Sequence, residues 1–498
     1  MNKLPTALTS PLLALDQSST TPLYRQLYDG LRQAILDGRI VPGARLPATR
    51  ALATELGVSR NTVMSAFDQL FAEGYLEGRV GDGTYVTRTL PDTLLHAGAT
   101  TMSAVALQGT GRRLSRRGAM LAATPVSTSR ERGQVGAFAP GIPAIDAFPF
   151  ETMATLAARR WRNLSSELLG YGDPAGYRPL RDAIAAYLGA ARGVRCSAEQ
   201  VIIVGGSQQG LDLTARVLLD SGNVVWMEDP GYLGARGALR AAGAEVIPVP
   251  LDAEGLDVVA GNARNAAVRL VYITPSHQYP TGVTMSLTRR LALLEWATHH
   301  DAWIIEDDYD SEYRYAGRPL AALQGLDRTG RVIYLGTFSK VLCPAIRLGY
   351  LVAPPDLVDA FVAARALADR HAPTIDQAVL TDFIVEGHFA RHIRRMRALY
   401  AERQAILLEA IERELSGLLD ARPAEAGMHL LTWLPDGIND QLAAQRAAEY
   451  GVIAPPLSAY NLAAPLRSGV LLGYAGVKPH AIEAGVKQLA AAWAKLCG

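Results

Sequence analysis

Lys340 lies in the stretch GTFSKVLCPAIRLGY, directly after an apolar run that reads VIYL. A lysine led from such a run into the protein interior loses its preference for the charged form, so its amine can be partly neutral at neutral pH. A neutral amine attacks carbonyl groups, and its product with an aldehyde is a Schiff base. Pyridoxal 5'-phosphate is the commonest biological aldehyde held in this way. This cofactor also needs a carboxylate for its pyridine nitrogen, a cradle for its phosphate and an aromatic partner for its ring.

The stretch AWIIEDDYD offers the carboxylate for the pyridine nitrogen and also a hydroxyl for the phenolic oxygen. Asp307 stands at the carboxyl end of a predicted strand, where open α/β sheets place their ligands. Tyr309 follows two residues later and points to the same side in an extended chain. Asp308 and Asp310 face the other way, and we expect them to be solvated or to cap a helix.

The cofactor also needs a cradle for its phosphate and a flat partner for its ring. VIIVGGSQQGLDL predicts a strand that runs into a helix, with Gly206, Ser207 and Gln208 at the helix start, where backbone N–H groups bind anions. Arg347, seven residues after the lysine, has the forked donors that suit phosphate. Tyr232, in MEDPGYLGAR, follows a Pro-Gly turn and could stack on the ring. Each residue alone also fits a structural role, and only their joint occurrence favours the cofactor.

The elements that must position these groups lie in residues 135–498. Helical patterns alternate there with the short apolar runs VIIVGG, VVWMEDP, VIPVP, RLVYITP, AWIIEDDYD and RVIYLGT. This alternation predicts an α/β domain with a mostly parallel sheet and helices on both faces. Residues 88–134 are rich in Thr, Ser, Ala, Gly and Arg without sustained periodicity, and we expect a flexible basic linker. The 498 residues are too many for one ordinary core, so a multidomain chain is expected.

Residues 1–87 predict an α+β winged helix-turn-helix domain. TPLYRQLYDGLRQAILD spaces Leu27, Leu31 and Ile35 along one helical face, and ATRALATELG predicts a second helix that ends at Gly57. VSRNTVMSAFDQLFAEGYL predicts a third helix with Ser59 as its N-cap. GYLEGRVGDGTYV then predicts two short strands around a Gly-Asp-Gly turn.

A recognition helix places its first side chains on base edges of double-stranded DNA, while flanking groups hold phosphates. Arg60 could pair with guanine, and Asn61 with adenine or a phosphate. Arg50 opens the preceding helix and could reach a phosphate, and Gly83 would let the wing backbone approach the DNA. The full set of predicted DNA-binding residues is Arg50, Ser59, Arg60, Asn61, Thr62 and Gly83.

The overall composition restricts the partners and the compartment. The net charge is +1, and it divides as 0 over residues 1–87, +5 over residues 88–133 and −4 over the rest, so a DNA-binding claim must rest on motif and arginine placement. No run of about 18 apolar residues or secretory leader is present, so we expect no membrane partner. Three scattered cysteines favour a reducing cytoplasm over a disulfide framework and indicate no metal site.

The motifs also carry a resemblance to known families. LPATRALATELGVSRNTVMSAFDQLFAEGYLEGRVGDGTYV closely resembles the GntR-type winged helix of bacterial transcription factors, over residues 20 to 87. The lysine, aspartate, glycine and arginine segments resemble the fold-type I aminotransferase family over residues 135–498. The whole chain is similar to the MocR subfamily of GntR regulators, in which the two domains are fused.

The resemblance implies a role for each matched residue. Lys340 would form the Schiff base, with Asp307 at the pyridine nitrogen and Tyr309 at the phenolic oxygen. Tyr232 would be the stacking ring, and the phosphate would be held by Gly206, Ser207, Gln208 and Arg347. YGDPAGYRPLR matches a signature whose tyrosine, Tyr171 here, reaches the phosphate in the neighbouring subunit. This last assignment implies a homodimer with shared sites.

Two departures from the aminotransferase pattern bear on function. The family's asparagine before PTG is replaced by Tyr279, so Gln278 or His277 could take over a polar contact, and His277 is expected to be a structural hydrogen-bonder rather than a base. The arginine that clamps the substrate carboxylate is replaced by Leu471, while Gly234 occupies the place of the arginine that a γ-aminobutyrate-sensing regulator uses.

A carboxylate clamp could still come from Arg467, which lies four residues before Leu471. Without a clamp, ordinary transamination of α-amino acids is disfavoured.

Three hypotheses follow from these observations. In the first, the chain is a dimeric regulator whose aminotransferase-like domain senses pyridoxal phosphate, or an amine such as taurine or an ectoine derivative, and controls operator binding. In the second, it is a working aminotransferase with an attached DNA-binding domain. In the third, the second domain is a degenerate fold that only dimerises. The substrate-carboxylate arginine separates the first two hypotheses, and the apparent loss of that arginine favours the sensor.

Overall fold

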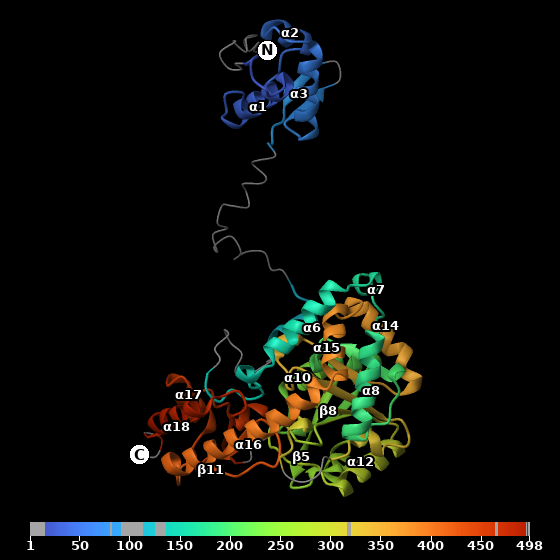
Figure 1. Ribbon diagram of the computed structural model, residues 1–498, viewed down its shortest axis with the longest axis vertical. Coiled ribbons are helices and arrows are strands. Elements are labelled where there is room, and N and C mark those ends of the chain that lie inside the picture. The colour runs from blue at the N-terminus through green and yellow to red at the C-terminus, as the bar shows by residue number, and fades with distance from the viewer. Residues whose placement is uncertain are drawn as a thin grey trace. The chain divides into compact units, whose positions relative to one another are not determined.

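The computed structural model describes residues 15–79, 82–90, 113–124, 136–315, 320–463, 467–494 and 496. The chain divides into two compact units, Met1–Arg113 and Leu114–Gly498. Both units are drawn in Figure 1. The predicted boundaries at residues 87 and 134 stay predictions, and most of the predicted linker lies outside the described residues.

The N-terminal unit is built from three helices and a hairpin. These are α1 (Leu23–Leu36), α2 (Thr49–Leu56), α3 (Arg60–Ala72), β1 (Leu76–Arg79) and β2 (Gly83–Val86). Leu27 and Leu31 of α1 pack with Val63 and Phe67 of α3 in a core of this unit's own residues. Gly57 ends α2 in a left-handed conformation with φ +65°, which is why a glycine closes this helix. The predicted winged helix-turn-helix order is confirmed.

Helix α5 (Arg116–Ala123) lies within the segment predicted as a linker. The Ser115 side chain caps it by accepting a hydrogen bond from the Gly118 N–H at 3.0 Å. It contacts helix α10 (Leu233–Ala241), where a Cβ added to Gly237 would lie 3.3 Å from the Thr124 methyl group. The segment predicted as a linker therefore includes a short helix that belongs to the C-terminal unit.

The C-terminal unit alternates strands and helices, as the apolar runs predicted. Its strands are β3 (Val201–Val204), β4 (Val224–Asp229), β5 (Glu245–Asp252), β6 (Gly255–Leu256), β7 (Leu270–Ile273), β8 (Trp303–Asp308), β9 (Val332–Thr337), β10 (Gly349–Val352), β11 (Asp420–Ala421), β12 (His429–Trp433) and β13 (Gly469–Gly473). Its further helices are α6 (Phe150–Arg162), α7 (Ser166–Leu169), α8 (Arg178–Arg192), α9 (Ser207–Leu218), α11 (Val258–Arg264), α12 (Leu287–His299), α13 (Leu323–Leu326), α14 (Val358–Asp369), α15 (Thr374–Val385), α16 (His388–Leu415), α17 (Asp440–Glu449) and α18 (Pro479–Trp493).

The larger sheet has eight strands in the order β3-β10-β9-β8-β7-β4-β5-β6. Strands β9, β8, β7, β4 and β5 pair in parallel, and β10 runs antiparallel between β3 and β9. The carboxyl ends of the parallel strands therefore lie at one edge of the sheet, where α/β folds place ligands.

Helices cover both faces of this sheet, because the side chains of each strand alternate between two apolar cores. Ile202 and Ile305 face one core with α9, α10 and α14, whereas Ile203 packs with α8 and α15 and Ile304 with α12 on the opposite face. This three-layer arrangement confirms the predicted α/β fold with a mostly parallel sheet.

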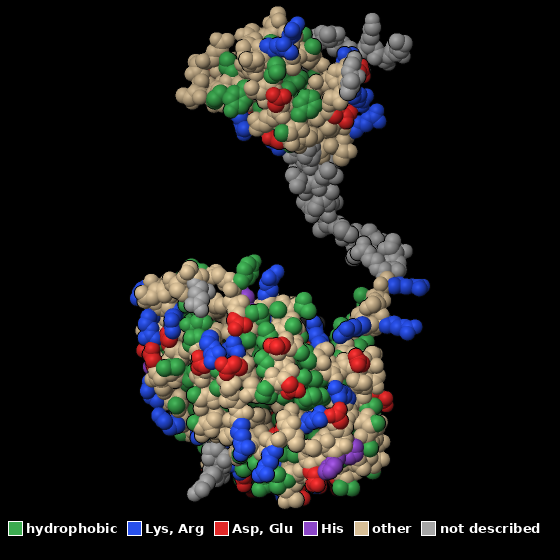
Figure 2. Space-filling model, turned by 90° about the vertical axis from the view of Figure 1, so that its right-hand side faces the viewer, with side chains coloured by type: hydrophobic (Ala, Val, Ile, Leu, Met, Phe, Trp, Pro, Cys, Tyr) green, Lys and Arg blue, Asp and Glu red, His purple; other side chains and the backbone are tan. Residues whose placement is uncertain are grey.

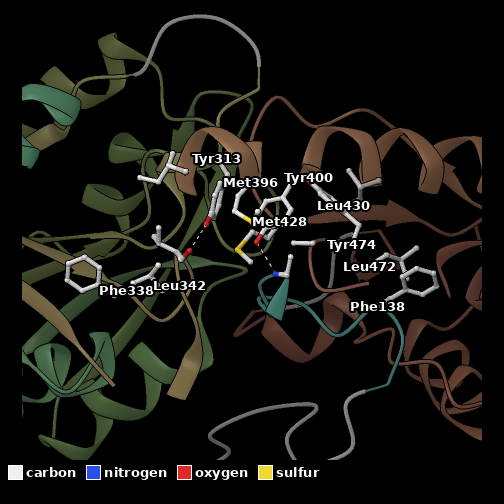
Figure 3. Close-up of a cluster of buried hydrophobic side chains, with 14 of the residues drawn as sticks. Phe138, Tyr313, Phe338, Leu342, Met396, Tyr400, Met428, Leu430, Leu472 and Tyr474 are labelled. Atoms are coloured by element: carbon white, nitrogen blue, oxygen red, sulfur yellow. Dashed lines mark hydrogen bonds between the residues drawn. The ribbon is translucent and has the colours of Figure 1, made fainter. Parts of the chain in front are cut away.

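A second, smaller sheet, β11-β12-β13, packs with α16, α17 and α18 and forms what we call the C-terminal subdomain, drawn from orange to red in Figure 1. A buried cluster joins it to the loop that carries Lys340 (Figure 3). There the Tyr313 hydroxyl donates to the Val341 carbonyl at 3.0 Å, and the Tyr400 hydroxyl accepts from the Ala144 N–H at 3.0 Å. The two parts of the C-terminal unit thus meet beside Lys340.

Charged side chains of both signs are interspersed over the face of the C-terminal unit seen in Figure 2, in agreement with a net charge near zero. Among the described residues, no helix is both long enough and apolar enough to cross a membrane.

Candidate functional site

The strand ends bring the predicted cofactor residues to one edge of the sheet. Gly206 follows β3, Tyr232 follows β4, Gln278 follows β7, Tyr309 follows β8 and Lys340 follows β9. Groups from two of these strand ends also interact, since the charge of Lys340 acts to lower the pKa of the Asp307 carboxyl. Residues that are far apart in sequence therefore lie at the same edge of the sheet.

Lys340 is half-buried, and its Nζ donates a hydrogen bond to the Gly141 carbonyl oxygen at 2.8 Å. Gly141 has φ +71°, and a Cβ at this position would lie 2.7 Å from Nζ. Only glycine combines this left-handed backbone with room for the lysine side chain. The segment around Gly141 therefore limits the space available to the reactive amine.

Asp307 is 4% exposed, and its Oδ2 accepts a hydrogen bond from the Tyr272 hydroxyl at 2.9 Å. Its Oδ1 is buried and has no hydrogen-bond partner among the described residues. Burial raises the pKa of Asp307 to about 7, although the Tyr272 hydrogen bond opposes this rise. A buried acceptor without a donor is costly, and the N–H of a protonated pyridine would satisfy it. The residue thus fits the pyridine nitrogen of pyridoxal phosphate.

The predicted phosphate cradle is also assembled. Gly206 has φ +116° and immediately precedes α9, whose first residues are Ser207 and Gln208. The Arg347 guanidinium lies 3.4–3.6 Å from the position of a Cβ on Gly206. A helix start and a fixed cation together form a site suited to a phosphate dianion. The Gln208 Nε2 already donates to the Gly234 carbonyl at 3.0 Å, so its side chain also braces the start of α10.

Tyr232 is the N-cap residue of α10, and its ring meets the Tyr279 ring edge-on at 5.8 Å between centroids. Tyr279 in turn meets Tyr309 edge-on at 5.9 Å. The predicted stacking ring and the predicted partner of the phenolic oxygen therefore flank one aromatic residue. Contact of either tyrosine with a cofactor stays a prediction.

Gln278 is 1% exposed, and its amide is engaged within the protein. Its Nε2 donates to the Pro230 carbonyl at 2.9 Å and to Glu228 Oε2 at 3.2 Å, while its Oε1 accepts from the Thr281 hydroxyl at 2.6 Å. The side chain links the turn after β4 to the turn after β7. A direct contact with the cofactor stays a prediction and would need one of these hydrogen bonds to be shared.

Tyr171 lies apart from these residues in its own chain. Its side chain is 86% exposed, and its ring contacts His371 edge-on at 6.2 Å and the Arg370 guanidinium at 5.4 Å. This exposure leaves the ring accessible to a partner. Its assignment to the site of a neighbouring subunit stays a prediction.

Leu471 and Gly234, the two places where a substrate-carboxylate arginine was expected, bring no cation to the site. Leu471 is fully buried in an apolar cluster with Leu233 and Tyr460, against which Tyr279 packs. Arg467 lies elsewhere, with its guanidinium over the Trp433 ring at 5.4 Å and 3.5 Å from an Asp420 oxygen.

The position of Gly234 is also closed to a longer side chain. A Cβ there would lie 2.5 Å from the Tyr232 hydroxyl and from Gln208 Oε1. A side chain at this position would therefore have to displace the predicted stacking ring.

The prediction that Asp308 and Asp310 are solvated is wrong, and Asp310 occupies the N-cap position of the 3-10 helix Ser311–Tyr313 without a capping hydrogen bond from its side chain. Asp308 is 5% exposed and forms an ion pair with Arg192 at 2.8 Å, and Asp310 is 1% exposed and lies 3.1 Å from His277 Nδ1. Asp308 lies on a face of β8 that is covered by protein, and Asp310 lies on the same side as Tyr309, because both contact Nδ1 of His277. His277 is hydrogen-bonded, as expected, to both Asp310 and Tyr309.

In the N-terminal unit, the predicted DNA-binding residues divide into two kinds. Ser59 Oγ caps α3 by accepting from the Thr62 N–H at 3.1 Å and lies 2.8 Å from the Thr62 hydroxyl, so these residues fix the start of the helix. Arg50, Arg60 and Asn61 are exposed, and within the described part of the unit neither arginine forms an ion pair. The exposed side chains are the ones available to DNA.

Gly83 opens β2 with φ +124°, and its backbone approaches Arg45. A Cβ on Gly83 would lie 3.0 Å from Nε of Arg45. Another nitrogen of this guanidinium, Nη1, lies 3.9 Å from Oδ1 of Asp82. Arg45 was missed in the sequence, because nothing local to GRIVPGARLP shows that it returns to the wing.

Three further residues of the C-terminal site were missed. Glu228 and Tyr272 lie on β4 and β7 beside Asp307, and burial raises the pKa of Glu228 to about 7. Gly141 contacts Lys340 across 199 residues of sequence. For Glu228 and Tyr272, the only sequence signal was a polar residue inside an apolar strand.

Comparisons with known proteins agree with this geometry. The family of bacterial regulatory proteins named gntR matches residues 23–86, and the family of class I and II aminotransferases matches residues 145–489. The chain is 44% identical to the probable rhizopine catabolism regulatory protein MocR of Rhizobium meliloti, over 97% of this chain and 96% of that protein.

Two further relatives resemble either the whole chain or its C-terminal unit. The chain is 32% identical to the pyridoxine biosynthesis transcriptional regulator PdxR of Corynebacterium glutamicum, over 93% of this chain and 94% of that protein. The crystal structure of LysN, the α-aminoadipate aminotransferase of Thermus thermophilus, matches with a TM-score of 0.70 and 33% identity, over 76% of this chain and 97% of that one.

Proposed function

The chain belongs to the MocR-type GntR regulators, in which a DNA-binding winged helix is joined to an aminotransferase class I and II domain, and we propose that this second domain is a pyridoxal phosphate sensor. The chain is thus a DNA-binding transcriptional regulator. Its second domain holds the cofactor through Lys340, and binding at that site changes the affinity of the DNA-binding domain for its operator.

The cofactor would be held by residues of three kinds. Lys340 binds its aldehyde carbon, Asp307 Oδ1 accepts from its pyridine nitrogen, and Gly206 and Arg347 hold its phosphate. When bound, the cofactor supplies an aldehyde carbon that exchanges between the lysine and free amines. The unpartnered Oδ1 of Asp307 and the position of Arg347 beside Gly206 support this assignment.

Sensing, rather than turnover, is supported chiefly by one observation, the buried apolar cluster of Leu471, Leu233 and Tyr460. The resemblance to aminotransferases implies a clamping arginine at the position of Leu471. A bidentate arginine anchors a carboxylate strongly, and an apolar surface does not. The effector is therefore pyridoxal phosphate itself or an amine compound. Its binding shifts the protein between states with different operator affinity.

An active aminotransferase is the second candidate. The 33% identity to an aminotransferase and the assembled lysine, aspartate and arginine favour it. Sustained production of a keto acid from a common amino acid would establish this activity and overturn the sensor-only proposal.

The DNA-binding unit reads its operator through Arg60 and Asn61, with Arg50 on a phosphate and the wing at Gly83. The regulator works as a homodimer in the cytoplasm, where both the DNA and the cofactor are found. The exposed side chains of these residues and the exposed Tyr171 support this arrangement.

The test uses two variants of the full-length chain, one expected to lose cofactor binding and the other expected to lose operator affinity. Lys340→Ala should lose the visible absorbance of the lysine-bound cofactor and the response of operator binding to pyridoxal phosphate. Arg60→Ala should keep the absorbance and lose about 1–3 kcal/mol of operator affinity with relaxed base preference. Absorbance is read by spectroscopy, and operator affinity is read by titration with labelled DNA.

Candidate amines, taurine among them, are then added during the operator titration to identify the effector. If Lys340→Ala leaves both the absorbance and the response to pyridoxal phosphate unchanged, the second domain serves only as a dimeriser. If Arg60→Ala abolishes the absorbance, the two functions are not divided between the two units.

A further inference from the structure

His277 lies in the loop after β7 and contacts two residues that follow β8. Its side chain is 2% exposed. Its Nδ1 lies 2.9 Å from the Tyr309 hydroxyl and 3.1 Å from Asp310 Oδ2. Tyr309 is the residue expected at the phenolic oxygen of the cofactor. The position of the imidazole proton therefore determines which hydrogen bonds the Tyr309 hydroxyl can make.

The contacts of His277 determine where its proton lies. An ionised carboxylate only accepts hydrogen bonds, so Asp310 requires a proton on Nδ1. The other nitrogen, Nε2, is buried without a partner among the described residues. A buried N–H without an acceptor is rarer in proteins than a buried acceptor without a donor. The arrangement thus favours a neutral ring with its proton on Nδ1.

This proton position fixes the role of the Tyr309 hydroxyl. A protonated Nδ1 cannot accept, so the Tyr309 oxygen receives a shared hydrogen bond from it. The tyrosine proton remains available to another acceptor. Burial raises the pKa of Tyr309 well above its usual value, with the charge of Asp310 adding to the rise, so the hydroxyl keeps its proton.

The opposite side of the imidazole is held by the C-terminal subdomain. Gly427 has φ +95°, and a Cβ on it would lie 2.1 Å from Cε1 of His277. The His429 ring lies 5.4 Å from the His277 ring, and its Nε2 donates to the Pro280 carbonyl at 3.1 Å. Burial lowers the pKa of His429 to about 3, so this neighbour is neutral. The segment that leads into β12 therefore packs directly against the imidazole of His277.

We propose that His277 is a positioning residue, which aims the Tyr309 hydroxyl proton at the phenolic oxygen of pyridoxal phosphate. The proposal rests on the proposed function, because it needs the cofactor on Lys340. The titratable groups around the imidazole are Asp310, Tyr309 and His429, with Lys340 and Asp307 nearby.

The test compares three replacements of His277. An Asn amide nitrogen can take the place of Nδ1 and keep donating to Asp310, whereas Gln reaches the place of Nε2 and Ala has no donor. For each full-length protein loaded with pyridoxal phosphate, the pH midpoint of the visible absorbance change is measured, and Tyr309→Phe is the reference.

Loss of the Tyr309 hydrogen bond leaves more charge on the phenolic oxygen, so the nitrogen that joins Lys340 to the cofactor holds its proton to higher pH. We expect the midpoint to rise by about one pH unit, a tenfold change in proton affinity, in Tyr309→Phe. It should rise in the same direction in His277→Ala and His277→Gln, stay near the native value in His277→Asn, and rise no further when His277→Ala is added to Tyr309→Phe.

A second measurement does not need the cofactor. Nitrogen-15 chemical shifts of selectively labelled histidines, assigned with His277→Asn, should show Nε2 of His277 unprotonated at neutral pH. A protonated Nε2, or a native midpoint in His277→Ala while Tyr309→Phe shifts it, would overturn the positioning role alone. Absence of the visible band from the native protein would overturn the proposed function, and this proposal with it.

Discussion

At the scale of single residues, the buried carboxyl of Asp307 combines a cost in stability with a role in binding. Its pKa is about 7 because burial disfavours the charged form. The unfolded chain gives up this proton near pH 4, whereas the folded chain keeps it to about pH 7. The free energy of unfolding therefore falls as the pH rises through that interval.

Asp307→Asn removes this cost in the cofactor-free protein. We expect the variant to be more stable than the native chain at pH 8, by about 4 kcal/mol at most, since each pH unit corresponds to about 1.4 kcal/mol. The difference should vanish near pH 4, and cofactor affinity should fall. Denaturant unfolding at several pH values measures it, with the exposed Asp436→Asn as the control; a gain that grows toward acid would contradict this assignment.

Gly141 gives a second test at this scale, because a matched glycine exists. Gly141 and Gly222 both have positive φ, but a Cβ at 141 meets Lys340 Nζ at 2.7 Å, whereas a Cβ at 222 meets nothing within 4 Å. Both alanine variants should lose about 1–2 kcal/mol of stability through backbone strain. Only Gly141→Ala should also bind pyridoxal phosphate more weakly, as read by absorbance titration. Equal cofactor affinities in the two variants would show that Gly141 does not limit the lysine.

At the scale of elements, the sequence predicted what local patterns encode. Six apolar runs gave six strands, and the placement of Asp307 and Lys340 at strand ends followed from the topology of parallel sheets. The surroundings of Asp308 and Asp310 could not be predicted, because Arg192 lies 116 residues away in sequence and His277 lies 33 residues away. Helix α5 was missed because it is only eight residues long and buries none of them.

Helix α5 supports a prediction of its own, since it rests on α10, the helix that begins directly after Tyr232. Gly237→Ala places a methyl group 3.3 Å from the Thr124 methyl, which a small shift can absorb, and Gly237→Leu extends further. Amide hydrogen exchange in residues 116–123 should rise slightly in the first variant and strongly in the second. Unchanged exchange in Gly237→Leu would mean that α5 is not held by this contact.

At the scale of the whole molecule, the exposed apolar face of α6 argues for a partner. Phe150 and Trp161 are 60% and 59% exposed and stand eleven residues apart, three turns along one helical face. Leu169 and Tyr171 follow with 64% and 86% exposure. Exposed side chains of this size mark interaction sites. We expect Trp161→Glu to be a monomer by sedimentation velocity and Arg162→Glu, on the same helix turn but polar, to remain a dimer.

A homodimer with shared sites predicts complementation between two defective chains. Tyr171→Ala homodimers lack the tyrosine at both sites, and Lys340→Ala homodimers lack the lysine at both. In a mixed dimer, one site receives Lys340 from one chain and Tyr171 from the other, and it should bind the cofactor with native affinity. Mixing the two proteins under conditions that exchange subunits should therefore restore tight binding and visible absorbance at one site of each mixed dimer.

The same mixture distinguishes a shared site from a site within one chain. If Tyr171 served the site of its own subunit, no mixed dimer could contain both residues in one site, and the absorbance titration would show only the weak binding of the Tyr171→Ala chain. Trp161→Glu introduced into both chains is the control, because monomers cannot complement each other. If cofactor binding is restored only when subunits exchange, each site contains residues from both chains. Cofactor binding would then depend on dimerisation.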